Sequence, residues 1–206
     1  MAALGRTVQP LYLGLMEEIK FRFGTISRIT QGDLPLPPKA IQEYCLLQIR
    51  MVCELISLAC LVAHGDISKS NRLTKTYQAD KIISELETLH PDFFPKPVTM
   101  TQTFRPVGWH LEPVTSGFLT KRDFLKVYHQ RCGSALHRGS LKNLISEKRQ
   151  PQVQFDEIKS WVDKIMKLLD RHIVMLRDGS TVVLCIMSNE KGVAQVAIAA
   201  AGDVLA

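Results

Sequence analysis

Arg131 and His137 are the two residues whose types and spacing suggest chemistry. Such a pair can cleave RNA without a metal, in a reaction where the 2′-hydroxyl attacks the adjacent phosphate. Histidine suits the acid and base steps because its unperturbed pKa is about 6.5. The planar fork of arginine binds phosphate oxygens at two points and stabilises their charge. The pair therefore indicates a phosphodiesterase site, and a capping or core-edge histidine is the structural alternative for His137.

The segment around this pair carries the net positive charge of the chain. The formal net charge is +6 over 206 residues, and residues 121–149 alone hold eight Lys and Arg against two acidic residues. A local excess of this kind suits a polyanion such as RNA; a solvated helix face is the alternative. The candidate nucleic-acid-binding residues are Lys121, Arg122, Lys126, Arg138 and Lys142.

A break in the helix is needed to bring Arg131 and His137 onto one face. On a continuous helix, six residues turn by about 600°, which leaves the two side chains roughly 120° apart. Gly133 can end one helix and Ser134 can cap the next. His137 would then lie at the positive end of the new helix, where phosphate binds favourably. Tyr128, one turn before Arg131, and Ser134 are the expected supporting residues.

The elements that position this segment are expected to be mainly helical. Apolar residues at steps of three and four predict helices over residues 11–30, 39–64, 74–90 and 155–171. Thr120 can cap a further helix, with Asp123 at its third position. The helix over 39–64 is apolar on most sides, so we expect it at the centre of a bundle.

The last 35 residues change character and predict strands. Turn signals at Asp178-Gly179 and near Gly192 separate runs rich in Val and Ile. Residues 98–117 look like extended chain or a short hairpin. The expected fold is mainly α: an up-and-down bundle of about five helices over residues 1–171. A small antiparallel β-meander, residues 172–206, would form an appendage packed on the fifth helix or on a partner chain.

Cysteine usage and the N-terminus indicate a soluble cytoplasmic protein. The five cysteines form no CxxC pair, which is typical of a reducing compartment. No Cys/His cluster has metal-ligand spacing, so neither a metal nor a cofactor is expected. The N-terminus has no signal-peptide pattern. Charged residues interrupt the longest apolar run, so no membrane span is expected.

The stretch YHQRCGSALH, residues 128–137, resembles the Arg-x(4–6)-His motif of the HEPN superfamily. The resemblance would cover about residues 11–170 and implies a compact helical bundle that forms homodimers. It also implies a metal-independent RNA endonuclease of a toxin–antitoxin or phage-defence system, with an antitoxin or accessory protein as a partner. Arg131 and His137 of two chains would meet at the dimer interface. Where the family often has Asn, Asp or His after the arginine, this chain has Cys132.

Three functional hypotheses follow from these patterns. In the first, the protein binds and cleaves RNA, with Arg131 stabilising the transition state and His137 acting as general acid or base. In the second, the same surface belongs to a non-catalytic RNA-binding or protein-interaction, regulatory module. In the third, the chain is a structural bundle in a larger complex. Arg50 and Glu54 are expected to be a satisfied pair between helices, with support of the motif as the alternative.

Overall fold

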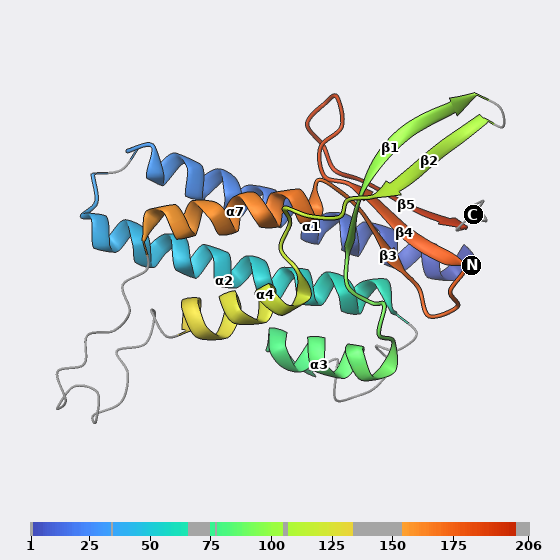
Figure 1. Ribbon diagram of the computed structural model, residues 1–206, viewed down its shortest axis with the longest axis horizontal. Coiled ribbons are helices and arrows are strands. Elements are labelled where there is room, and N and C mark those ends of the chain that lie inside the picture. Colours follow the sequence, from blue (N-terminus) through green and yellow to red (C-terminus); the bar gives the residue numbers. More distant parts are fainter. Residues whose placement is uncertain are drawn as a thin grey trace.

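The computed structural model describes residues 2–33, 35–65, 75–76, 78–104, 107–133 and 154–200. The helices are α1 (Ala2–Thr30), α2 (Pro38–Ala63), α3 (Ala79–Leu89), α4 (Lys121–Lys126), the π-helix η3 (Val127–Gly133) and α7 (Phe155–Leu169). The strands are β1 (Lys96–Phe104), β2 (Val107–Pro113), β3 (Arg171–Met175), β4 (Thr181–Ile186) and β5 (Gln195–Ala200). Figure 1 shows the helices alongside one another, with the sheet at the end where α1 begins.

The strands form one five-stranded antiparallel sheet in the order β2-β1-β3-β4-β5. The expected mainly α bundle with a small meander is therefore wrong, and the fold is a mixed α/β arrangement. The meander β3-β4-β5 forms as expected, but the hairpin β1–β2 extends it. Lys96 pairs with Ile173 and Pro97 with His172, which joins the hairpin to β3. The two parts of this ladder lie far apart in the chain, and neither carries a local signal of the pairing.

The turns of the meander follow their sequence signals. Gly179 has φ 68° and Gly192 has φ 72°, in the left-handed region that glycine adopts without steric cost. The Asp178 carboxylate accepts hydrogen bonds from the backbone N–H groups of Ser180 and Thr181, at 2.9 and 2.8 Å. These contacts fix the β3–β4 connection where residues 178 and 179 predict it.

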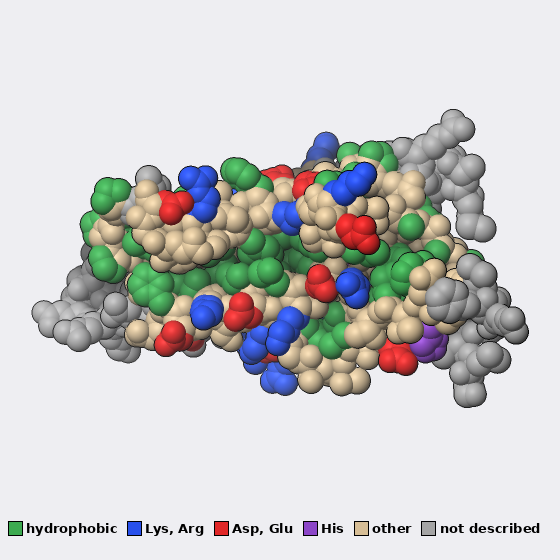
Figure 2. Space-filling model, turned by 90° about the horizontal axis from the view of Figure 1, so that it is seen from above, with side chains coloured by type: hydrophobic (Ala, Val, Ile, Leu, Met, Phe, Trp, Pro, Cys, Tyr) green, Lys and Arg blue, Asp and Glu red, His purple; other side chains and the backbone are tan. Residues whose placement is uncertain are grey.

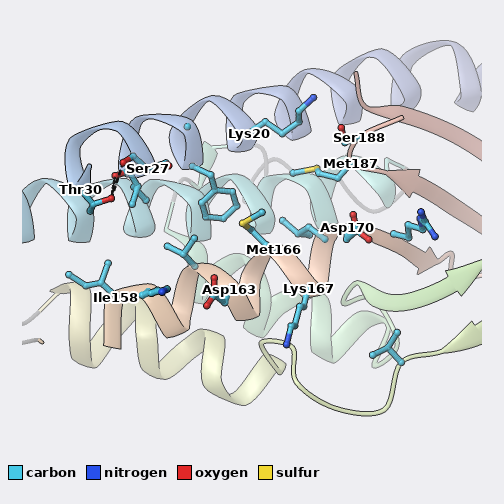
Figure 3. A pocket seen from close by; sticks show the side chains of 18 of the residues that line it. Lys20, Ser27, Thr30, Ile158, Asp163, Met166, Lys167, Asp170, Met187 and Ser188 are labelled. Atoms are coloured by element: carbon cyan, nitrogen blue, oxygen red, sulfur yellow. Dashed lines mark hydrogen bonds between the residues drawn. The ribbon is translucent and has the colours of Figure 1, made fainter. Parts of the chain in front are cut away.

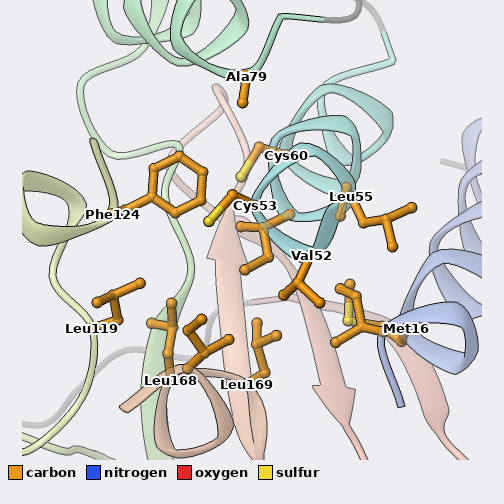
Figure 4. Packing of buried hydrophobic residues seen from close by; sticks show 14 of the residues in the cluster. Met16, Val52, Cys53, Leu55, Cys60, Ala79, Leu119, Phe124, Leu168 and Leu169 are labelled. Atoms are coloured by element: carbon orange, nitrogen blue, oxygen red, sulfur yellow. The ribbon is translucent and has the colours of Figure 1, made fainter. Parts of the chain in front are cut away.

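Helix α2 lies at the centre of the hydrophobic core, as its nearly continuous apolar surface predicts. Its buried residues include Val52, Cys53 and Cys60. Figure 4 shows Met16 of α1 and Phe124 of α4 approaching α2 from different sides. By length and composition α2 could cross a membrane, yet 67% of that window is buried inside the protein. This is the arrangement of a core helix in a soluble protein.

The meander packs on its own chain, chiefly against α1. The Glu17 carboxylate accepts a 2.6 Å hydrogen bond from the N–H of Ala194, just before β5. Tyr12 of α1 and His172 of β3 are both fully buried and lie 2.7 Å apart. Strand β3 also contacts α7, the helix on which the sequence predicted the meander to pack. The division of the chain at residue 171 into two parts stays a prediction.

The Tyr12–His172 pair fixes the protonation of the histidine. His172 Nδ1 lies 2.9 Å from the carbonyl oxygen of Leu169, which can only accept, so Nδ1 carries the proton. Nε2 then accepts the hydrogen bond from the Tyr12 hydroxyl. Burial lowers the pKa of His172 from 6.5 to about 4. The imidazole is therefore neutral near pH 7, with both of its nitrogens hydrogen bonded.

We expect this histidine to make the protein sensitive to acid. The folded-state pKa is depressed, so the stabilisation is present above the unfolded pKa and is lost as the pH falls toward 4. At pH 5 the loss amounts to about 2 kcal/mol relative to pH 7. Urea unfolding at both pH values measures it in the wild type, in His172→Gln and in the control His110→Gln on exposed β2. An equal pH dependence in all three proteins would contradict the assignment to His172.

Candidate functional site

The predicted site begins on a helix whose start matches its sequence signal. Thr120 is the N-cap of α4, and its Oγ1 accepts a 3.1 Å hydrogen bond from the backbone N–H of Asp123. Helix α4 passes directly into η3, whose wider π turns span Val127–Gly133. Single π turns inside helices are uncommon and occur frequently at functional sites. Arg131 lies within η3.

The structure places only part of the predicted catalytic motif. Gly133 still belongs to η3. Ser134, His137, Arg138 and Lys142 lie outside the described residues, and so does the helix break expected between Gly133 and Ser134. The convergence of Arg131 and His137 therefore stays a prediction.

Two of the predicted RNA-binding lysines form ion pairs within the protein. Lys121 pairs with Glu87 of α3, and its Nζ lies 5.6 Å from the ring centroid of Phe93. Lys126 Nζ lies 3.4 Å from the carboxylate of Asp123. Arg122 is exposed and forms no ion pair with the residues that the structure describes. The free positive charge on α4 is thus smaller than the residue count of this segment indicates.

A polar group on α2 holds η3 against the core. The Tyr128 hydroxyl donates a 3.3 Å hydrogen bond to Oε1 of Glu54, and Arg50 Nε donates to the same oxygen at 3.3 Å. The Arg50 guanidinium also lies 5.3 Å from the centroid of the Tyr128 ring. Burial, followed by the charge of Glu54, raises the pKa of Tyr128, so its hydroxyl stays protonated as a donor. Arg50 and Glu54 thus form the expected pair between helices, and this pair also fixes Tyr128.

His129 adds an accessible imidazole beside this group. Its Nε2 lies 3.4 Å from a carboxylate oxygen of Asp80, in the first turn of α3. The His129 side chain is 51% exposed. The imidazole also packs edge-on against Tyr128, with 5.3 Å between ring centroids. No local sequence pattern indicates the contact between His129 and Asp80, because the two residues lie on different helices. The described part of the site thus combines one exposed imidazole with a satisfied Arg–Glu–Tyr group.

Cys132 packs in the core and is not positioned for nucleophilic chemistry. Its side chain is fully buried. Burial raises the pKa of the thiol to about 12, and the nearby Arg50 charge opposes this only partly. The thiolate is the reactive form, so a thiol with this pKa is inert near pH 7. HEPN proteins often have a polar residue at this position. In this chain the buried Cys132 makes an apolar contact between η3 and α2 instead.

No family model matches the chain, and no curated protein or solved structure is significantly similar to it. Within the described ranges, no group of three or more His, Cys, Asp or Glu side chains is placed to hold a metal ion. The fold and the site together describe a mixed α/β protein whose π-helical turn carries Arg131 two positions after the exposed His129.

Proposed function

We propose that this protein binds RNA at the surface where η3 leaves α4, and that Arg131 and His137 cleave the bound strand without a metal. The observation that carries this proposal is the position of Arg131 in a π turn, which the Tyr128–Glu54–Arg50 contacts anchor to α2. A turn that supporting contacts hold in place can position an arginine for phosphate binding. The same turn lies within residues 121–149, which hold the net positive charge of the chain.

The chemistry of the proposal is transfer of a phosphodiester to the neighbouring hydroxyl. The 2′-oxygen loses its proton to a base and bonds to phosphorus, while the bond to the 5′-oxygen breaks and that oxygen takes up a proton. The products are a 2′,3′-cyclic phosphate and a 5′-hydroxyl end. His137 acts on one of the two protons. Arg131 stabilises the charge on the phosphorane-like transition state.

The resemblance to HEPN proteins supplies the assembly in this proposal. Two chains would bring together their Arg131 and His137 residues in a homodimer, with an antitoxin or accessory protein as the regulator. Cytoplasmic location belongs to the same proposal. All five cysteines are free and buried in the structure, which suits a reducing compartment.

A non-catalytic binding module is the second candidate function. The ion pairs of Lys121 with Glu87 and of Lys126 with Asp123 favour it, because they leave less free charge for RNA than a basic nuclease surface would offer. In that case the surface would bind RNA weakly or would bind a protein. RNA binding that persists in His137→Ala, without any cleavage by the wild type, would support this second function.

We expect neutralisation of Arg122, Arg138 and Lys142 to weaken RNA binding. The triple variant Arg122→Gln, Arg138→Gln, Lys142→Gln should lose about tenfold or more in affinity for single-stranded RNA. The slope of log K against log salt should become less steep by about 2, because each lost phosphate contact removes about 0.7. Fluorescence anisotropy over a salt series measures both quantities.

The matched control places the same three changes on other exposed cations. Arg28, Lys39 and Lys191 lie on α1, α2 and the β4–β5 connection, and all three are exposed. Their triple Gln variant has the same net charge as the test variant and should keep nearly all of the affinity. Equal losses in both triple variants would show a non-specific charge effect and would contradict the proposed surface.

A further inference from the structure

A long apolar groove runs between α1 and α7, away from the η3 site. Its volume is about 1380 Å³. Figure 2 looks onto this side of the molecule and shows an apolar band along the long axis, with charged side chains on both sides. The apolar lining includes Phe23, Ile41, Val162, Met166 and Met187. The Met166 side chain is 52% exposed, so part of this surface is left uncovered by the described chain.

The α7 wall of the groove carries charges of alternating sign. Asp156, Lys159, Asp163, Lys167 and Asp170 all line it, at steps of three and four residues. Figure 3 shows Asp163 and Lys167 on α7 and Asp170 just past its C-terminal end. None of the five forms an ion pair with another residue in the part of the chain that the structure describes. These charges are thus available, at helical spacing, to a molecule in the groove.

Small residues line part of the α1 wall, beside Lys20 and Phe23. Gly24, Ser27 and Thr30 line it one turn apart. A Cβ atom added at Gly24 would meet nothing within 4 Å, so space is open above this residue. The Thr30 hydroxyl is satisfied within its own helix by the carbonyl oxygens of Ile26 and Ser27, both at 2.9 Å. A helix backbone can approach such a wall closely.

The dimensions of the groove fit a helix better than a small molecule. From Asp156 to Asp170 the α7 wall is about 21 Å long, at 1.5 Å per residue. The volume divided by this length gives a cross-section of roughly 65 Å², which suits a helix that is partly inserted. Pockets for drug-sized ligands are usually smaller, about 300–1,000 Å³. Met166 and Met187 add flexible side chains that adapt to the apolar face of a partner.

We propose that the groove between α1 and α7 binds an amphipathic α-helix of about four turns from a partner protein. Apolar residues of the partner, at steps of three and four, would lie on Phe23, Val162 and Met166. Its flanking residues would alternate between basic and acidic and pair with the stripe on α7. A second copy of this chain fits less well. A twofold axis perpendicular to α7 would pair two antiparallel copies of this helix. Because the charge stripe reads the same in both directions, a pairing centred on Asp163 would set like charges side by side.

A synthetic peptide tests this binding on the full chain. The probe is a labelled amphipathic helix of about 18 residues, with a Leu stripe flanked by alternating Lys and Glu; a scrambled peptide of the same composition is the reference. Fluorescence anisotropy should show micromolar binding of the helical peptide only. Equal binding of both peptides, or no binding of either up to about 500 μM, would overturn the proposal.

Two glycine variants locate the binding site. Gly24→Leu fills the groove, and we expect it to weaken peptide binding at least about tenfold. Gly14→Leu makes the same change on α1 outside the groove, where an added Cβ also meets nothing within 4 Å, and it should bind like the wild type. Circular dichroism melting confirms that both variants fold. Unchanged binding by Gly24→Leu contradicts the assignment.

A charge swap tests the stripe on α7. Asp163→Lys should weaken the affinity for the peptide with alternating Lys and Glu several-fold, and a peptide with Glu in place of the facing Lys should restore the affinity.

Other occupants of the groove would give different results. If sedimentation shows a wild-type dimer that Gly24→Leu converts to monomer, the groove binds a second copy. If dodecanoate binds in a Gly24→Leu-sensitive manner and no peptide does, it binds a small amphipathic molecule. Either result overturns the partner-helix proposal and leaves the RNA proposal unaffected.

Discussion

His137→Ala is expected to slow metal-free RNA cleavage by about 10²–10⁴-fold, the usual contribution of a positioned general acid or base. Without the imidazole, water must accept or supply one of the two protons of the reaction. Binding should change little, because phosphate contacts from arginine and lysine dominate affinity. Single-turnover cleavage of an end-labelled RNA in excess EDTA measures the rate, and anisotropy measures the binding.

The control for this variant is another accessible histidine. His110 lies on β2, and its side chain is 57% exposed. His110→Ala should cleave like the wild type. The proposed RNA cleavage would be excluded if the wild-type protein, alone or with an accessory partner, produced no 2′,3′-cyclic phosphate. Equal rates in the wild type and in His137→Ala would show that another group transfers the proton.

Phe124→Ala is expected to lower the free energy of unfolding by about 3–5 kcal/mol. The Phe124 side chain is fully buried in the core beside α2. Its ring packs edge-on against Phe94, with 5.6 Å between centroids. Truncation leaves a cavity at the point where α4 joins the core, so η3 should also lose its fixed position. Urea unfolding measures the stability, and the RNA anisotropy assay measures the consequence for binding.

Two further variants distinguish the loss of buried packing from the effect of replacing any phenylalanine. Phe21 on α1 is 68% exposed, and Phe21→Ala should change the stability by no more than about 0.5 kcal/mol. Phe124→Leu keeps most of the buried volume and should lose clearly less stability than Phe124→Ala. If Phe124→Ala and Phe21→Ala had similar effects, the packing of α4 on the core would be contradicted.

The elements with strong local signals were predictable from the sequence. The apolar period over residues 39–64 matches α2, and the period over 155–171 matches α7. Thr120 caps α4 as its hydroxyl and spacing predict, and glycines at 179 and 192 close the turns of the meander. In each case the residues that define the element lie within a few positions of one another. Helix α1 begins at Ala2, well before the apolar stripe that predicted it.

The remaining features depend on contacts between distant parts of the chain. The ladder between Lys96 and Ile173 turns the meander into a five-stranded sheet, and no local pattern encodes that register. The same holds at the candidate site. Lys121 is engaged by Glu87 from another helix, which a count of basic residues along one segment could not show. The π form of η3 also has no spacing signal of its own.

RNA is proposed to contact the chain at η3 and the segment that follows it. The most direct test is a titration of isotopically labelled protein with a single-stranded RNA whose 2′-hydroxyls are methylated, so that it binds without being cleaved. We expect the largest NMR shifts on Arg122, on the residues of η3 and on the imidazole of His137. Saturable shifts confined to other parts of the chain, or no shifts at all, would contradict it.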